Sequence, residues 1–223
     1  MTGRPDDGPV ATAVEAYYTD KLRSHGSTPK GVDWRDGASQ RTRLRQLSAV
    51  WRDDRDFVVG DLGYGYGAMV GFMRTARTPF RKFVGVDLSS EMIEQARRRW
   101  RHEPRARWSV ASTFPQRVDF AVASGIFNVR LDFDDRTWRE HVFAMIETLA
   151  RSSRIGFAFN MLTVHSDREF MRRQLWYADP AEILDHCLRR WSRRVELTQD
   201  YGLYEFTVRV RHERPVRKSA ASR

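Results

Sequence analysis

Three glycines alternate in the segment DLGYGYG, residues 61–67, between an apolar run and a segment with helical character. Gly63, Gly65 and Gly67 carry no Cβ, so the backbone here can approach a ligand closely. A phosphate-binding P-loop requires a Lys and a Ser or Thr after its last glycine, whereas Ala and Met follow here. The dinucleotide pattern G-x-G-x-x-G/A does fit, so the glycines alone leave the ligand open.

Asp61 narrows the choice of ligand. It precedes the first glycine by two residues, at the end of the apolar run. A carboxylate at this position would repel a pyrophosphate but would attract an ammonium group. S-adenosylmethionine carries an amino group, a carboxylate and a sulfonium, and it carries no phosphate. The position of Asp61 therefore favours this cofactor over a dinucleotide.

Three segments together resemble the motifs of the class I S-adenosylmethionine-dependent methyltransferases. VVGDLGYGYG, residues 58–67, has the apolar strand, acidic residue and alternate glycines of the first motif. FVGVDLSSEMI, residues 83–93, resembles the second motif, whose strand ends in an acidic residue. VDFAVASGIFNV, residues 118–129, lies where the family's fourth strand is expected. The resemblance extends over residues 55–160 and implies a methyltransferase with S-adenosylmethionine as its cofactor.

The resemblance implies a cofactor site built from the ends of these strands. Asp61 would face the ammonium group, and Asp87 would accept hydrogen bonds from the two ribose hydroxyls, as the acidic residue of a dinucleotide fold does. The glycines would let the backbone approach the methionine part of the cofactor. Leu88 and Met92 would pack near the adenosine. Ser124, within the fourth-strand motif, is a further expected contact.

Departures from the family pattern leave other cofactor contacts open. Tyr64 stands where a small residue or Cys is common, so its ring either lies near the sulfonium as a cation–π partner or fills space. The Asp that often meets the adenine after the third strand is missing, and Ser112, Thr113 or a backbone group would have to serve. Arg43 either pairs with the carboxylate of the cofactor or lies on a solvated helix face.

Methyl transfer from a sulfonium demands mainly that the acceptor be positioned. The nucleophile must lie about 3 Å from the methyl carbon, in line with the C–S bond, and a hydroxyl or ammonium acceptor also needs a base. His25 is the best candidate for this base by residue type, with a surface histidine as the alternative. Asn128, in ASGIFNV, either orients an acceptor or caps a turn. ASGIFNV lacks the Asn/Asp-Pro-Pro-aromatic pattern of methyltransferases that act on planar amines.

Aromatic and polar residues outside the motifs are candidates for the acceptor site. The segment before residue 55 is expected to fold over the cofactor and the acceptor as a lid that excludes water. The candidates for acceptor contacts are Tyr18, Trp34, Asn160, Tyr177 and Tyr204. For the tyrosines, packing in the core or in a hairpin is the alternative role. No metal site is expected, because a helix N-terminus explains the aspartates of residues 132–135 better.

Strands and helices that alternate along the chain must position these residues. Apolar runs predict strands and amphipathic segments predict helices. The predicted strands cover residues 56–62, 82–88, 105–112, 118–128, 154–163 and a pair within 193–213, and the predicted helices cover 11–24, 39–53, 67–76, 89–102, 135–153 and 179–192. This alternation predicts an α/β fold: a doubly wound, seven-stranded, mostly parallel sheet with a C-terminal antiparallel hairpin, helices on both faces and an N-terminal helical lid. Ligands of such sheets bind at the carboxyl ends of the strands.

The chain divides into three predicted parts. Residues 1–54 are expected to form an N-terminal helical lid and substrate segment, residues 55–214 the methyltransferase core, and residues 215–223 a basic disordered tail. No stretch approaches the ~20 apolar residues of a membrane span, and a single cysteine excludes an internal disulfide. We expect a cytoplasmic protein, a monomer or homodimer, that does not associate with a membrane.

The net charge of +10 leaves two functions open. Only four of the 39 basic residues are lysines, and the arginines are spread along the chain, so each group could be a solvated helix face. The first hypothesis is a methyltransferase that acts on an oxygen or nitrogen of a small metabolite, such as a sugar or a natural-product intermediate. The second is an RNA methyltransferase whose arginine surface and basic tail hold a tRNA or rRNA, with an affinity that falls steeply with salt.

Overall fold

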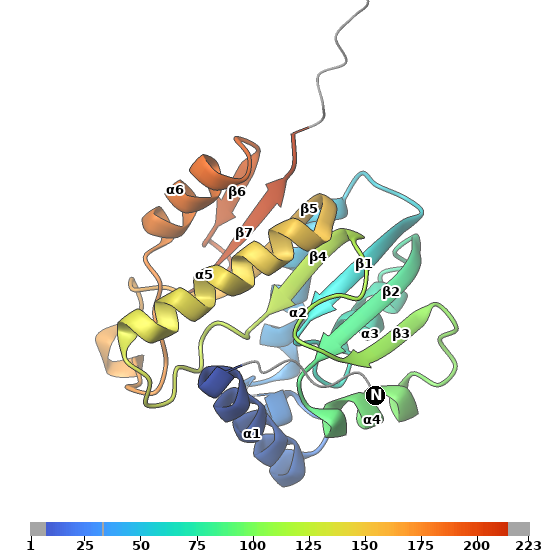
Figure 1. Ribbon diagram of the computed structural model, residues 1–223, viewed down its shortest axis with the longest axis horizontal. Helices are drawn as coiled ribbons and strands as arrows, with labels where there is room; N and C mark the ends of the chain where they lie inside the picture. Colours follow the sequence, from blue (N-terminus) through green and yellow to red (C-terminus); the bar gives the residue numbers. More distant parts are fainter. Residues whose placement is uncertain (1–7, 33, 214–223) are drawn as a thin grey trace, which may run out of the picture.

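A seven-stranded sheet runs through the centre of the computed structural model, which describes residues 8–32 and 34–213 (Figure 1). The strands are β1 (Phe57–Leu62), β2 (Phe80–Asp87), β3 (Ala106–Val110), β4 (Val118–Ser124), β5 (Ser153–Leu162), β6 (Val195–Thr198) and β7 (Glu205–Arg211). Their order is β3-β2-β1-β4-β5-β7-β6. The first five strands are parallel, and β7 pairs antiparallel with both β5 and β6. The predicted sheet with its C-terminal hairpin is confirmed.

Helices cover both faces of this sheet. They are α1 (Gly8–His25), α2 (Gly37–Ser48), α3 (Ala68–Thr75), α4 (Ser90–Arg99), α5 (Asp135–Ser152) and α6 (Pro180–Arg190). One hydrophobic cluster joins α5 and α6 to one face of the sheet, and a second joins α2 and α3 to the other. Figure 1 shows α5 and α6 in front of the strands and α2 and α3 behind them. This arrangement confirms the predicted doubly wound architecture.

The segment before the sheet is part of the core as well as a cover. Leu47 of α2 is fully buried between the helix and the sheet, and Val10 and Val14 of α1 pack on the cluster beneath α5. The predicted helix 39–53 begins earlier, at Gly37, because the Asp36 carboxylate accepts the Ser39 N–H at 2.7 Å and caps the helix. The predicted boundaries at residues 54 and 214 remain predictions, and the predicted tail 215–223 lies outside the described residues.

The connection from β3 to β4 crosses the sheet without a helix. Residues 111–117 form neither a helix nor a strand, and Phe114 of this connection packs on the sheet at Gly60. A Cβ on Gly60 would lie 2.6 Å from the Phe114 ring, so the side chain fills the space at that position. The α5 face of the sheet is therefore covered partly by this short connection and partly by α1.

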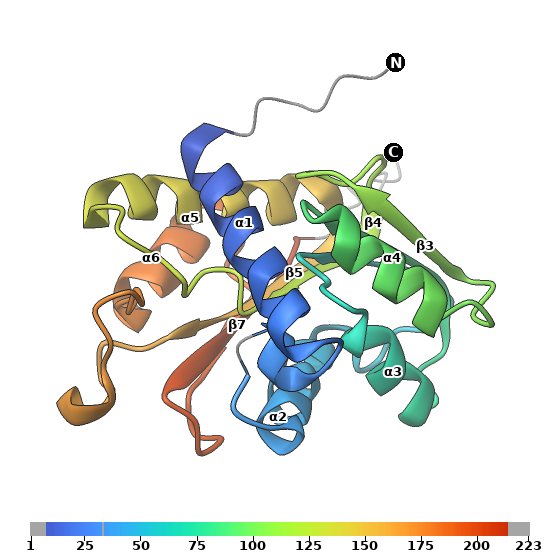
Figure 2. The same cartoon turned by 90° about the horizontal axis from the view of Figure 1, so that it is seen from below.

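The register of the strands brings the carboxyl ends of β1, β2, β4 and β5 together at one edge of the sheet. Leu62, at the end of β1, is opposite Val86 of β2 and Ala123 of β4. Ser124, the last residue of β4, is opposite Asn160 of β5. Seen from below, α1 lies in front of this edge (Figure 2). No helix within the described part of the chain is long and apolar enough to span a bilayer.

Candidate functional site

A cavity of about 290 Å³ lies at the carboxyl ends of β1, β2 and β4. Its floor is formed by the ends of these strands and by the turn that follows β1. Side chains of α1, α2 and α5 form the walls, together with the connection after β3. The cavity therefore lies where the parallel topology predicts a ligand site.

The glycine turn after β1 has a backbone conformation that other residues adopt rarely. Gly63, Gly65 and Gly67 all have positive φ, at 70°, 58° and 83°. The Gly65 N–H donates a hydrogen bond to the Asp87 carboxylate at 2.9 Å, which joins the turn to the end of β2. Gly63 and Gly65 line the cavity. Gly67 is the N-cap of α3 and is covered by Trp100, whose Nε1 would lie 2.5 Å from a Cβ there.

Asp61 and Asp87 place two carboxylates at the cavity wall. Asp61 is only 4% exposed, and burial raises its pKa well above the usual range, with the nearby Asp87 charge raising it further. Burial also raises the pKa of Asp87, against the effect of hydrogen bonds that its carboxylate accepts from the Ser89 and Gly65 N–H groups. The ionised form of each acid is therefore disfavoured in the free protein. A positively charged ligand beside the two carboxylates would stabilise their ionised forms.

The remaining groups of the wall also fit a positively charged ligand. Glu15 adds a third carboxylate, and no lysine or arginine is found among the described residues that line the cavity. The Tyr64 hydroxyl and the Ser124 hydroxyl are buried at the wall without a hydrogen-bond partner in the described structure. The Tyr64 ring packs on Trp108, with centroids 4.8 Å apart. These orphaned hydroxyls indicate that a polar ligand completes the site.

The structure brings twelve of the predicted residues together around the cavity. They are Tyr18, Trp34, Asp61, Gly63, Tyr64, Gly65, Asp87, Leu88, Met92, Ser112, Thr113 and Ser124. These residues come from α1, the segment before α2, the ends of β1, β2 and β4, α4 and the connection after β3. Their role in binding remains a prediction, but they line the same cavity.

The two predicted catalytic residues do not line the cavity. His25 is the exposed last residue of α1, because the helix continues to this position and leaves the side chain in solvent. Asn128 is buried, and its side-chain oxygen accepts the Leu162 N–H at 3.1 Å. Its carbonyl accepts the Trp176 N–H at 2.8 Å. We therefore revise both assignments: His25 is a surface residue, and Asn128 joins the loop after β4 to the end of β5.

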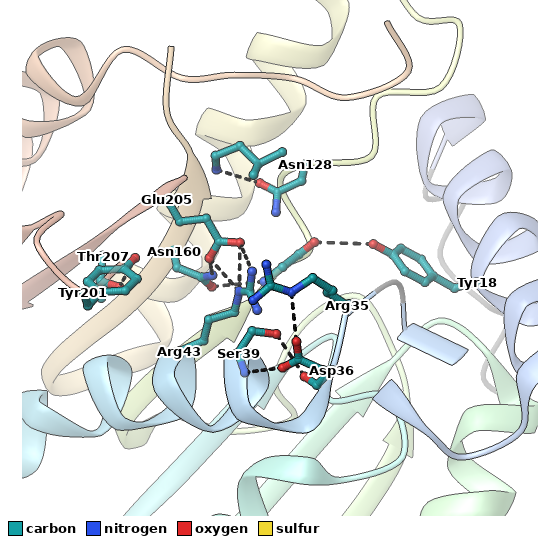
Figure 3. Close-up of polar contacts among 12 residues, drawn as sticks. Tyr18, Arg35, Asp36, Ser39, Arg43, Asn128, Asn160, Tyr201, Glu205 and Thr207 are labelled. Carbon is teal, nitrogen blue, oxygen red and sulfur yellow. Dashed lines mark hydrogen bonds and ion pairs between the residues drawn. The ribbon is translucent and has the colours of Figure 1, made fainter. Parts of the chain in front are cut away.

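Arg43 and Asn160 lie behind the cavity wall. The Arg43 side chain pairs with Glu205 of β7, with Nε 2.7 Å from Oε2, rather than extending into the cavity. The Asn160 side chain donates to Glu205 at 2.7 Å and accepts the Gly125 N–H at 3.1 Å (Figure 3). The predicted contact of Arg43 with a cofactor carboxylate is thus replaced by an ion pair within the protein.

Tyr177 and Tyr204 lie away from the cavity. The Tyr177 hydroxyl accepts the Arg172 N–H at 2.9 Å. Tyr204 is 43% exposed, donates a hydrogen bond to Asp167 and has its ring 5.8 Å from that of Phe170. Both tyrosines therefore contact the segment between β5 and α6 rather than the cavity.

Sequence reasoning missed several residues of the wall, including His141. This histidine lies on α5 beside Trp138, with ring centroids 5.2 Å apart, and burial lowers its pKa. Gln40 and Tyr66 also line the cavity, and the Tyr66 hydroxyl donates a hydrogen bond to Gln40 Oε1 at 2.8 Å. A signal for His141 was present, since it has the spacing that places it on one helix face with Ala144, Met145 and Thr148, which also line the cavity.

Comparisons with known proteins support the enzyme class that the sequence motifs predict. A family model described as a methyltransferase domain matches residues 59–152. The protein Rv1506c of Mycobacterium tuberculosis, which is named as a methyltransferase, is 44% identical over 155 residues, covering 70% of this chain and 93% of that protein.

Two solved complexes have the same fold. The N-methyltransferase NodS of Bradyrhizobium japonicum, in complex with S-adenosyl-L-homocysteine, has a TM-score of 0.64 at 14% identity, covering 90% of this chain and 99% of that one. A complex described as DhpI-SAM-HEP has a TM-score of 0.61 at 15% identity, covering 89% and 94%.

Proposed function

Since the chain belongs to the class I S-adenosylmethionine-dependent methyltransferases, we propose that the cavity binds S-adenosylmethionine and that the protein methylates an oxygen or nitrogen of a small metabolite. The observation that carries this proposal is the pair of carboxylates at the ends of β1 and β2, in a wall without lysine or arginine among its described residues. A pyrophosphate would be repelled there, whereas a sulfonium and an ammonium are attracted.

The residues of the wall suit the parts of this cofactor. Asp61 would hold the ammonium group, and Asp87, fixed by Gly65 and Ser89, would accept hydrogen bonds from the ribose hydroxyls. Leu88 and Met92 offer an apolar surface for the adenosine. The cofactor supplies an activated methyl group, so the protein has to bind, orient and exclude water.

A base is needed where the acceptor is a hydroxyl or an ammonium group, and we assign this role to His141. Among the described residues that line the cavity it is the one histidine, and burial lowers its pKa, which leaves the imidazole neutral and able to accept a proton at neutral pH. Tyr18 and Trp34 would form the part of the wall nearest to the acceptor, because both contact Gly125 at the end of β4.

The arginine surface supports the small-molecule hypothesis better than the RNA hypothesis. Many exposed arginines pair with a carboxylate one helical turn away, as in the pairs Arg98–Glu94, Arg136–Glu140 and Arg189–Asp185. Such pairs neutralise the charge locally. The acidic wall of the cavity also does not favour a phosphate-bearing acceptor close to the reacting centre.

Calorimetry with S-adenosylmethionine and S-adenosylhomocysteine tests the cofactor assignment. We expect both to bind at a single site, and NAD not to compete with them. Incubation with methyl-labelled cofactor and panels of sugars, nucleosides and amino-acid derivatives then tests the acceptor class by mass spectrometry. Binding of NAD in place of the cofactor would overturn the proposal, and methylation of RNA alone would replace the small-molecule acceptor with the second hypothesis.

A further inference from the structure

Glu205 connects the last strand of the sheet to the N-terminal segment through a buried ion pair. It is the first residue of β7 and is 1% exposed. Its carboxylate accepts hydrogen bonds from Arg43 Nε at 2.7 Å and from Asn160 Nδ2 at 2.7 Å. Figure 3 shows the three side chains converging from α2, β5 and β7. The ion pair thereby joins Arg43 and Glu205, which are 162 positions apart in the sequence, behind the cavity wall.

Arg43 also contacts Trp34, a residue of the cavity wall. The carbon of its guanidinium lies 4.1 Å from the centre of the Trp34 ring, in a cation–π contact. The Trp34 ring also packs directly on Gly125, where a Cβ would lie 2.2 Å from it. Gly125 has a φ of +79°, and its N–H is held by Asn160. The indole is thus held between Arg43 and the backbone that follows β4, and it lines the cavity.

The ion pair is poorly explained as a purely stabilising feature. A buried pair gains little over apolar residues of the same shape, because both charges lose their hydration. Arg43 is 8% exposed, and its Nη1 is buried without a hydrogen-bond partner in the described structure. A pair kept for stability alone would be expected to satisfy all its donors. The arrangement instead presents a fixed, flat cation to the Trp34 ring.

We propose that Glu205 is a positioning residue, which acts through Arg43 to hold Trp34 against Gly125 and so keeps this wall of the cavity closed over its ligand. The position of the Trp34 side chain in the cavity wall is then determined by Glu205, a residue of β7. The inference rests on the proposed function where it concerns ligand retention. The position of Trp34 itself can be measured in the ligand-free protein.

Glu205→Gln removes the charge with little change of shape, and Arg43→Met removes the cation. In the ligand-free protein, the fluorescence of Trp34 is obtained as the difference between each variant and its Trp34→Phe counterpart. We expect acrylamide to quench this component more strongly in Glu205→Gln. We also expect S-adenosylhomocysteine to dissociate about tenfold faster from Glu205→Gln and from Trp34→Ala, as the loss of a desolvated cation–π contact implies.

The double variant Glu205→Gln/Arg43→Met separates positioning from stability. It leaves no unpaired charge, so we expect it to regain most of the unfolding free energy lost in Glu205→Gln, while Trp34 stays mobile and dissociation stays fast. Recovery of slow dissociation and low quenching in the double variant would show a merely structural role and overturn the proposal. If Glu205→Gln does not fold, unchanged dissociation in Trp34→Ala overturns it equally.

Asp54→Asn is the matched control. Asp54 pairs with Arg211, also on β7, at 2.6 Å, but this pair lies outside the cavity wall. We expect the control to lose stability without a change in the quenching of Trp34. Failure of the wild-type protein to bind S-adenosylhomocysteine would refute the proposed function, while the quenching measurements would still decide the position of Trp34.

Discussion

Asp61 is a buried acid whose ionised form a positively charged ligand would stabilise. Its pKa is raised by burial and by Asp87, so the folded protein without ligand retains this proton to a higher pH than the unfolded chain does. The protonated carboxyl therefore contributes stability at low pH, and this contribution is lost as the pH rises through the raised pKa. An ammonium ligand favours the ionised form, so binding must release a proton.

We expect the affinity for S-adenosylmethionine to increase with pH through the raised pKa of Asp61, with proton release on binding. Calorimetry between pH 5 and pH 8, in pairs of buffers with different ionisation enthalpies, measures both quantities. Asp61→Asn should bind more weakly and show a smaller pH dependence. Equal slopes for the variant and the wild-type protein would remove Asp61 from the site.

Asp87 tests the other end of the cofactor site. Asp87→Ala removes the acceptor proposed for two ribose hydroxyls and should weaken binding roughly tenfold to a hundredfold, since hydrogen bonds to a charged group contribute about 1.5–3 kcal/mol. Asp185→Ala, which removes an exposed carboxylate of α6, is the control and should bind normally. An unchanged affinity in Asp87→Ala would contradict the assignment of this carboxylate.

At this scale, the sequence predicted the strand-end residues well and the distant ones poorly. Asp61, Asp87 and Ser124 follow from local motifs, because the end of a parallel strand fixes where its last side chain lies. Arg43 and Asn128 could not be placed in the same way. Their partners, Glu205 and Leu162, are remote in the sequence, and no local pattern announces a pairing across 162 or 34 positions.

Among the elements, α1 and α4 are linked by Ser89, which also caps α4. The Ser89 side chain caps α4 by accepting the Met92 N–H at 3.3 Å, and its hydroxyl is 2.9 Å from that of Thr19 on α1. The pair Arg23–Glu91 joins the same two helices at the surface. Helix α1, which forms a wall of the cavity, is thus attached to α4, the helix that follows Asp87.

Ser89→Ala should lower the free energy of unfolding by about 1 kcal/mol through the lost cap, and should weaken cofactor binding because α1 loses an attachment. Urea denaturation and calorimetry measure the two effects. Ser90→Ala, at the exposed neighbouring position, should change stability by less than about 0.5 kcal/mol. Equal effects at the two positions would exclude the cap as the cause.

The order of the elements was predictable because strand and helix patterns alternate after residue 55. Leu44 and Leu47 lie on one face of the segment that forms α2, which is consistent with their burial, but the expected lid gave no reason to place α1 in the core. The faces of both helices are only weakly apolar in sequence, yet Leu47 and Val10 are buried. For α1, packing against the face of the sheet that has no helix between β3 and β4 decides this outcome, whereas α2 packs on the opposite face beside α3. Both are tertiary effects.

For the molecule as a whole, the net charge of +10 and the acidic cavity act on different partners. We expect the affinity for S-adenosylhomocysteine, which carries no net charge, to change little with salt. An RNA contact to six or more phosphates would instead weaken roughly a thousandfold between about 50 and 200 mM salt. Titrations at both salt concentrations distinguish the two. RNA binding that is tight at the lower salt concentration and weakens this steeply at the higher one would favour the RNA hypothesis.

Helix α1 is at once a wall of the cavity and, through Val10 and Val14, a piece of the hydrophobic interior. Any molecule that seals this wall therefore also secures the interior, so occupancy is coupled directly to resistance to heat. A compound present at a hundred times its dissociation constant adds about 2.7 kcal/mol to the folded state. Melting curves taken in the presence of candidate metabolites can consequently rank acceptors before any turnover has been observed.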